Sequence, residues 1–416
     1  MSSIGWVDFS EKDRQRTLGV LRLLDEPGTL DALGIGRIRD AFSDLLFPGT
    51  STIQTRARYF LIVPWLYRDL ELRSPRQRPE AEAAKKERGL IERFNAARES
   101  GGGDLEGLIG SQAGAAIRQL PSAIYWQGLH AWGIRRKAGP RRVFLREVRL
   151  GRIDRTPRPE EEMTSIFTSW WDRGLPPKPD DLLEKPTLEL TPEEAAYLQE
   201  AIAVNQPESL LAHLARQDEP LPRTGLVWNL PAGHISDLPA RLEKNLGHAR
   251  RFSLLVHGAH ILYYLMLAEM RTDGAEELEH HRQAIDNWRK EIESRRSELI
   301  EWFGDESSRC RFWMAAKQSN PRIPGPLEKR FVETWFDLTI DPSNGQIDSS
   351  EARALLTQRE LALKGSHRAR LSNAGAREYW TGSDQVGPLD FRWGTVQRHL
   401  ADIHTGLAAT TEPVHA

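Results

Sequence analysis

The stretch LGIGRIRDAFSDLLFPGTSTIQTRARYFLIVPWL, residues 33–66, combines two predicted helices, a tight connection and the least polar run in the N-terminal half of the chain. Its first apolar residues follow the i, i+3, i+4, i+7, i+8 spacing of a helix that buries one face: Ile38, Ala41, Phe42, Leu45 and Leu46. Phe47-Pro48-Gly49 should end this helix, because proline cannot continue the hydrogen-bond ladder and glycine accepts left-handed backbone angles.

A second helix is predicted to begin at Ser51, which we expect to act as its N-cap. From Tyr59 to Leu66 the residues are apolar on almost every side, so this helix should be buried and kinked near Pro64. One face of the helix would carry Ile53, Ala57, Phe60, Leu61 and Pro64.

The polar residues of the same stretch suggest an anion site. Three hydroxyl residues, 50–52, surround the predicted helix N-terminus, whose free N–H groups and dipole favour negative charge. The alternative is that the hydroxyls only cap the helix while nearby arginines pair with Asp40 and Asp44. The candidate phosphate-binding residues are Thr50, Ser51, Arg56 and Arg58.

Length and composition limit the possibilities. A chain of 416 residues is too long for one core, and we expect an N-terminal helical domain (1–159), a small acidic region (160–240) and a C-terminal helical domain (241–416). The single cysteine, Cys310, excludes an internal disulfide and fits a reducing compartment. No signal peptide is recognisable, and no window reaches the ~18 apolar residues of a membrane span, so a cytoplasmic protein is expected.

The charges are strongly segregated along the chain. The formal net charge is −2, which gives no global signal for binding a polyanion. Residues 135–158, however, hold ten Lys/Arg against two acidic residues, whereas residues 160–219 hold fourteen acidic residues against four Lys/Arg. Such asymmetry predicts either that one face meets an anion or that the two segments meet each other.

The basic segment follows two predicted helices, 111–119 and 122–132, and contains a turn signal at Ala138-Gly139-Pro140. Helix, helix and basic hairpin is the order of a winged helix, expected near 111–146 within a mainly α fold. In that arrangement Tyr125, Gln127 and His130 would face bases of double-stranded DNA. A purely structural winged helix, or an ordinary helical pair, remains the alternative. The residues expected to contact phosphates are Arg135, Arg136, Lys137, Arg141 and Arg142.

The second half of the chain predicts a long helical hairpin. Residues 251–269 are strongly apolar, and 276–303 form a charged return helix with an apolar seam. His257 and His260 lie three residues apart and could ligate a metal with further donors, but histidines in an apolar helix more often form core hydrogen bonds. We therefore expect no metal and no cofactor.

Near the C-terminus, Ser349 or Ser350 should cap a helix that ends at Gly365. A second basic block follows this helix and is predicted to contact an anion, in concert with Arg56 and Arg58: Lys364, Arg368 and Arg370. A final helix carries an apolar face of Val396, Leu400, Ile403 and Leu407.

Two long motifs, GWVDFS at residues 5–10 and LGIGRIRDAFSDLLFPGTSTIQTRARYFLIVPW at 33–65, resemble the N-terminal signature of a bacterial family known only as a domain of unknown function. The resemblance extends along the whole chain, with a further similar block at the C-terminus. It implies a place in anti-phage defence gene neighbourhoods, beside helicases and nuclease-like proteins. The family brings no active site that could be carried over to these residues.

Three functions are consistent with the sequence. The first is a non-catalytic subunit of a defence complex that contacts double-stranded DNA or another nucleic acid through the basic residues, with other defence proteins as partners and no membrane. The second is a protein-interaction scaffold. The third is an enzyme whose site is assembled from Asp40, Asp44 or the histidines. The usual phosphate-loop, dinucleotide, metalloprotease and serine-hydrolase motifs are absent.

Overall fold

The computed structural model describes residues 31–72, 78–101, 105–150, 169–218, 220–271, 275–341, 348–378, 380 and 387–409. Within these ranges the protein is helical and contains no β-strand, only an isolated bridge between Arg135 and Trp171. The mainly α prediction is therefore confirmed. The motif GWVDFS at residues 5–10 lies outside the described residues.

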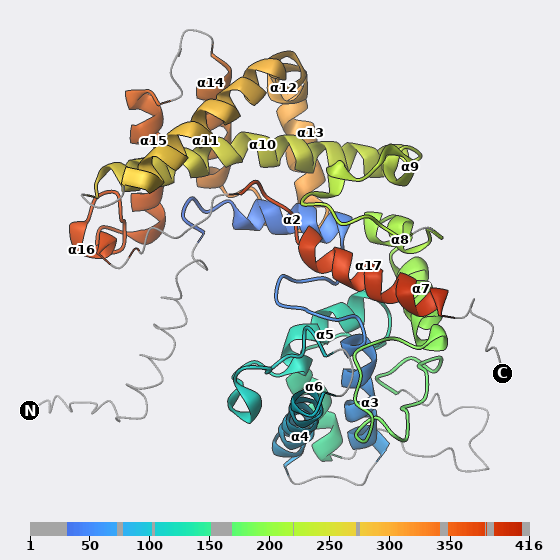
Figure 1. Ribbon diagram of the computed structural model, residues 1–416. Coiled ribbons are helices and arrows are strands. Elements are labelled where there is room, and N and C mark those ends of the chain that lie inside the picture. The colour runs from blue at the N-terminus through green and yellow to red at the C-terminus, as the bar shows by residue number, and fades with distance from the viewer. Residues whose placement is uncertain are drawn as a thin grey trace, which may run out of the picture. The chain divides into compact units, whose positions relative to one another are not determined.

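The helices are named as in Figure 1. In chain order they are α2 (Gly36–Leu46), α3 (Tyr59–Leu72), α4 (Pro79–Glu99), the 3-10 turn η1 (Gly114–Ala116), α5 (Pro121–Ala131), α6 (Arg141–Leu150), α7 (Pro192–Asn205), α8 (Leu210–Ala215), the 3-10 turn η2 (Val227–Asn229), α9 (Ala232–Ile235), α10 (Ala240–Glu269), α11 (Ala275–Ser294), α12 (Arg296–Phe303), α13 (Glu306–Lys317), α14 (Pro326–Ile340), α15 (Ser350–Lys364), α16 (Ala374–Arg377) and α17 (Trp393–Ala408).

The chain divides into two compact units. Unit 1 consists of residues 1–41 and 248–389, and unit 2 consists of residues 42–247 and 390–416. The division falls inside α2 and inside α10, so each unit is built from segments that are distant in the sequence. The domain boundaries expected near residues 159 and 240 remain a prediction.

The opening stretch forms two helices, but the second begins later than predicted. The apolar stripe from Ile38 to Leu46 forms α2, and Pro64 lies inside α3 as expected. The N-cap predicted at Ser51 is wrong, because α3 begins at Tyr59. The Gln54 side chain accepts a hydrogen bond from the Ser51 amide and donates to the Gly49 carbonyl, so the intervening residues form a loop held by side chains.

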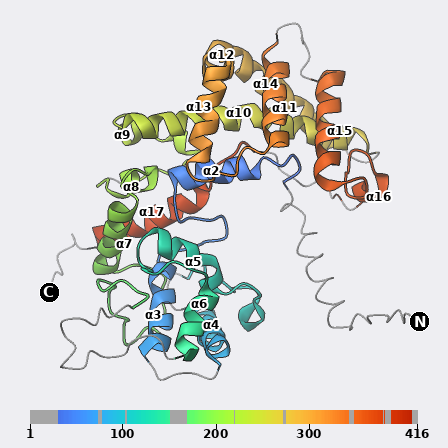
Figure 2. The ribbon, with the colours of Figure 1, turned by 180° about the vertical axis from the view of Figure 1, so that it is seen from behind.

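Helices α3, α4, α5 and α6 form one part of unit 2 and lie together in both views (Figures 1 and 2). Their aromatic core brings Tyr67, Trp126 and Phe144 within 6.0 Å of one another, ring centre to ring centre. The hairpin predicted around Ala138-Gly139-Pro140 is wrong: Arg141 to Leu150 is helix α6, and Pro140 stands just before its start, where proline is tolerated. The winged helix is therefore not supported.

The predicted helix at 111–119 is reduced to the single turn η1. Residues 169–172 are not helical. The helix predicted over 122–132 is confirmed as α5, with Pro121 at its first turn.

The other part of unit 2 pairs α7 with α17, which run side by side in Figure 1. Thr191 caps α7: its hydroxyl accepts from the Glu194 amide while the Glu194 carboxylate accepts from the Thr191 amide. Gly406 of α17 allows the close approach, because a Cβ there would lie 2.7 Å from the Cβ of Ala195.

Unit 1 is organised around α10 and its return helix, which is broken at Arg295 into α11 and α12. Trp288 and Trp335 stack with ring centres 6.2 Å apart, and their indoles donate to α10 carbonyls, those of Leu254 and Leu255. Figure 2 shows α13, α14 and α15 crossing this pair. Ser349 caps α15 and Gly365 ends it with a φ of 72°, both as predicted.

Among the described residues, α10 alone is long and apolar enough to cross a membrane by length and composition. About 78% of its apolar window is buried inside the protein, as in the core helix of a soluble domain.

Candidate nucleic-acid interface

Arg135, the first residue of the basic segment, is buried. It follows α5 after Trp132 and Gly133, whose positive φ of 70° turns the chain back. The guanidinium lies 4.9 Å from the Trp126 ring centre and donates to the carbonyls of Trp126, Lys137 and Gly139. Burial lowers the pKa of Arg135 to about 10, so it stays charged at neutral pH. This arginine joins the end of α5 to the start of α6.

The next two cations already have carboxylate partners. Arg136 is exposed, with 63% of its side chain accessible, and it pairs with Asp172. The same carboxylate accepts a hydrogen bond of 3.2 Å from the Tyr197 hydroxyl, which ties it to α7. Lys137 lies 3.3 Å from the Glu147 carboxylate of α6. These pairs link the basic segment to the protein itself.

Arg141 belongs to a buried polar cluster at the start of α6. The Glu87 carboxylate of α4 accepts from the amide and the hydroxyl of Ser122, both at 2.8 Å, and from the Tyr67 hydroxyl at 3.0 Å. Arg141 donates to the Ser122 hydroxyl at 2.6 Å and lies 3.7 Å from Glu87. Burial raises the pKa of Glu87, although the hydrogen bonds of Ser122 and Tyr67 oppose it. The cluster fastens α3, α4, α5 and α6 together.

The outward side of α6 is different. Phe144, Leu145 and Val148 point into the core, whereas Arg142 and Arg146 are exposed one helical turn apart. Neither arginine has an ion-pair or hydrogen-bond partner among the described residues. Arg142 is thus the one predicted phosphate contact in this segment whose guanidinium is not engaged within the described structure.

The residues expected to face bases are not all accessible. Gln127 and His130 are exposed on α5, but Tyr125 is fully buried. Its hydroxyl accepts from the Thr55 amide at 2.8 Å and donates to the Arg56 carbonyl at 3.0 Å. Tyr125 therefore organises the loop before α3.

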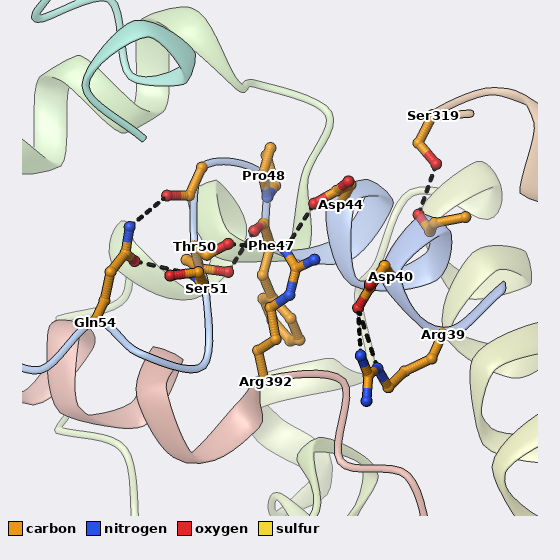
Figure 3. A network of polar contacts seen from close by, with 12 residues as sticks. Arg39, Asp40, Asp44, Phe47, Pro48, Thr50, Ser51, Gln54, Ser319 and Arg392 are labelled. Carbon is orange, nitrogen blue, oxygen red and sulfur yellow. Dashed lines mark hydrogen bonds and ion pairs between the residues drawn. The ribbon is translucent and has the colours of Figure 1, made fainter. Parts of the chain in front are cut away.

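The loop with Thr50 and Ser51 is held by hydrogen bonds from its own residues and from Arg392, as Figure 3 shows. The Thr50 hydroxyl donates to the Phe47 carbonyl at 2.7 Å. Arg392, from the start of α17, donates to the Thr50 carbonyl at 2.8 Å and pairs with Asp44 at 2.6 Å. An arginine does lie beside these hydroxyls, but it comes from the far end of the chain.

The N-terminus of α3 does receive an anion, and this anion is a carboxylate of the chain. Asp402 of α17 accepts from the Ala57 amide at 2.8 Å and from Arg56 at 2.9 and 3.1 Å. Arg58 is 2.7 Å from Glu194 of α7, and both side chains are 4% exposed. An anion is therefore bound at a helix N-terminus as predicted in kind, but the helix begins at Tyr59 instead of Ser51, and the anion is the carboxylate of Asp402.

The C-terminal basic block lies in unit 1, whereas the other predicted site residues lie in unit 2. Lys364 is 2.9 Å from Glu360, a fully buried carboxylate that also accepts from the Leu371 amide. Arg368 is exposed and donates to the Lys364 carbonyl at 3.3 Å. Arg370 is half-buried.

The groups considered for catalysis or metal binding do not converge. Asp40 pairs with Arg39 at 2.9 Å (Figure 3), and Asp44 pairs with Arg392. Within the ranges that the structure describes, no three or more His, Cys, Asp or Glu side chains are grouped so that they could hold a metal ion.

Glu87 organises the buried polar cluster at the start of α6, although no motif in the sequence marks it. Glu87 lies on the buried face of α4, together with Ala83, Leu90, Ile91 and Phe94. A carboxylate within an apolar helical stripe was the signal that could have identified it, because buried acids require dedicated partners.

A comparison with protein families gives a match over almost the whole chain. The model of a family of unknown function, DUF6361, matches residues 1–406. No curated protein and no solved structure matches the chain. Because the match spans nearly all of its 416 residues, the chain belongs to the DUF6361 family.

Proposed function

We propose that this protein is a non-catalytic subunit that contacts the phosphate backbone of nucleic acid through the outward face of α6. Its place in a bacterial anti-phage defence complex, with other defence proteins as partners, rests on the family resemblance alone. The observation that carries the proposal is the exposed pair Arg142 and Arg146, which has no partner among the described residues.

Guanidinium groups suit this role because they form paired hydrogen bonds with phosphate oxygens. Two of them on one helix face can bind neighbouring phosphates without reading the bases. Arg135 and Arg141 are excluded from this contact surface, since their guanidinium groups are already engaged by carbonyls and by the Glu87 cluster. The proposal therefore predicts binding without sequence specificity.

The test is a duplex-binding titration of the full chain at several salt concentrations. The Arg142→Ala/Arg146→Ala variant should bind more weakly and should reduce the slope of log K against log salt by about 2, because each lost phosphate contact removes about 0.9. The matched control is Arg282→Ala/Lys290→Ala on α11, which removes the same charge from two exposed cations in unit 1. The control should leave the slope unchanged.

Two results would reject the proposal. One is absence of duplex binding by the wild-type chain at low salt. The other is an equal loss of binding in the α6 variant and in the α11 control, which would mean that only the net charge matters. Arg141 is left unchanged in the test, because its loss would disturb the Glu87 cluster as well as the charge.

A protein-interaction scaffold is the second candidate, and one observation favours it. Three large apolar side chains of unit 1 are exposed on successive helices: Ile300 of α12, Met314 of α13 and Leu327 of α14, at 45, 62 and 61%. A scaffold would form a salt-tolerant complex with a neighbouring gene's product that Met314→Ser/Leu327→Ser weakens. Elution of wild-type protein mixed with that product as two separate species would count against it.

A further inference from the structure

A second feature of unit 2, independent of the α6 arginines, is a cavity of about 600 Å³ between α3, α4 and residues 178–183. Figure 1 shows α3 and α4 next to each other in this part of the molecule. A volume of this size accommodates a small organic ligand. No sequence motif pointed to this cavity, because its walls come from three separate segments.

The inner wall of the cavity is apolar. Leu66 of α3, Leu90 of α4 and Leu182 line it, and the last two are almost completely buried. Gly89 of α4 also lines the cavity. A Cβ added at this glycine would meet no heavy atom within 4 Å. Glycine inside a helix lowers stability relative to alanine, and here no neighbouring atom requires the absence of a side chain. This glycine leaves the wall of the cavity uncovered.

Four cations line the cavity: Lys85, Lys86 and Arg93 from α4, and Lys178. Lys86 and Lys178 share one carboxylate, Asp69, at 3.2 and 3.3 Å. Burial raises the pKa of Asp69, but the two ammonium groups outweigh burial and hold it below its ordinary value. Asp69 therefore balances one of the two ammonium charges of Lys86 and Lys178.

The other two cations are available to a ligand. Lys85 and Arg93 are exposed, and neither has an ion-pair or hydrogen-bond partner among the described residues. They lie eight residues apart with Gly89 midway, so all three share one face of α4. Two carboxylates, Glu82 and Asp180, complete the charged lining and could accept hydrogen bonds from a ligand N–H group.

We propose that this cavity binds a small phosphorylated molecule whose apolar body lies against Leu90 and Leu182 and whose phosphate meets Lys85 and Arg93. A nucleotide and an alkyl phosphate share this chemistry. The cations supply charge-assisted donors for the phosphate, and the leucines exclude water from the body of the ligand.

Calorimetric titration of the full chain with three probes tests the proposal. Adenosine diphosphate and octyl phosphate each carry an apolar or flat body, and inorganic phosphate is the control without one. We expect at least one of the first two to bind with a Kd below about 1 mM and at least about tenfold more tightly than inorganic phosphate. Which of the two binds distinguishes a nucleotide site from an alkyl-phosphate site.

Variants at the cavity sharpen the result. Gly89→Trp should abolish binding by filling the cavity, and Lys85→Ala/Arg93→Ala should weaken it about tenfold or more and remove its salt dependence. Gly89→Ala also replaces the helical glycine but adds only a methyl group to the cavity, so this variant should retain binding. Thermal melting of each variant verifies that it folds.

The proposal is overturned if neither organic phosphate binds the wild-type chain, if inorganic phosphate binds as tightly, or if Gly89→Trp folds and binds unchanged. The duplex-binding test at Arg142 and Arg146 does not involve this cavity, so the two proposals can fail separately.

Discussion

The arginines at the start of α3 and those along α11 carry the same charge but serve different purposes. In unit 2, Arg58 meets a carboxylate 136 residues away, and both partners are buried. In unit 1, Arg289 of α11 pairs with Asp286, and Arg295, just after α11, pairs with Glu291; each pair lies within one helical turn, and 29–55% of each side chain is exposed. Buried pairs define how segments come together, whereas exposed pairs within a helix contribute little to stability.

The largest effect is therefore expected at Arg58. Arg58→Ala leaves Glu194 buried without its cation and should lower the free energy of unfolding by about 3–5 kcal/mol. Asp286→Asn, which removes an exposed pair of α11, should change it by less than about 0.5 kcal/mol. Urea unfolding monitored by tryptophan fluorescence measures both.

A double change separates loss of charge from loss of shape. Arg58→Met/Glu194→Gln keeps the volume and the acceptor for the Thr191 amide while removing both charges. The double variant should be more stable than Arg58→Ala, because Arg58→Ala leaves one buried charge without its partner, whereas the double variant leaves no buried charge. Equal stabilities for Arg58→Ala and Asp286→Asn would contradict the contrast between the two regions.

Helical glycines give the second comparison. A Cβ at Gly258 of α10 would lie 2.1 Å from the Trp288 ring, which is buried and hydrogen-bonded to the Leu254 carbonyl. Gly258→Ala should therefore destabilise the protein by about 1–3 kcal/mol through overpacking. Gly89→Ala in unit 2 meets open space and should stabilise it by about 0.5–1 kcal/mol. Thermal melts with the same sign for both would refute this reading of the two helices.

The smallest effect at neutral pH, and a growing one in acid, is expected at His399 of α17. The imidazole is fully buried among the rings of Phe60, Tyr125 and Trp132, and neither ring nitrogen has a hydrogen-bond partner among the described residues. Burial lowers its pKa from 6.5 to about 3. Between these values the unfolded chain binds the proton more readily than the folded one.

The stability associated with neutral His399 is thus complete above pH 6.5 and is lost as the pH falls towards 3. His399→Leu should flatten the acid limb of the stability profile and change little at pH 8. Urea midpoints from pH 4 to 8 measure this. A variant whose acid limb is as steep as that of the wild type would show that other groups control it.

Sequence patterns predicted the helices whose signals are local. The spacing from Ile38 to Leu46, the N-cap at Ser349 and Gly365 after α15 are all realised, because each depends on residues within a few turns. The start of α3 was misplaced because its capping carboxylate, Asp402, lies 345 residues away. Propensity within a short window contains no information about such a partner.

The basic segment shows the same limit for the candidate site. Its composition predicted contact with an anion, but the burial of Arg135 and the use of Arg141 depend on Trp126, Glu87 and Ser122. Among the described residues of the segment, the arginines that are exposed and have no ion-pair or hydrogen-bond partner are Arg142 and its neighbour Arg146. The charge of each residue could be read directly from the chain, whereas its accessibility required the packing of four helices.

The interrupted layout of the two units has a consequence for synthesis on the ribosome. Unit 2 cannot close until α17 emerges, because Asp402 and His399 complete its interior, and unit 1 must wait for residues up to 389. The nascent polypeptide therefore exposes apolar surface that later segments will cover, and it does so for most of its translation. Premature termination shortly before Trp393 would yield a product in which α7 lacks the helix that covers it, a natural target for chaperones and proteases.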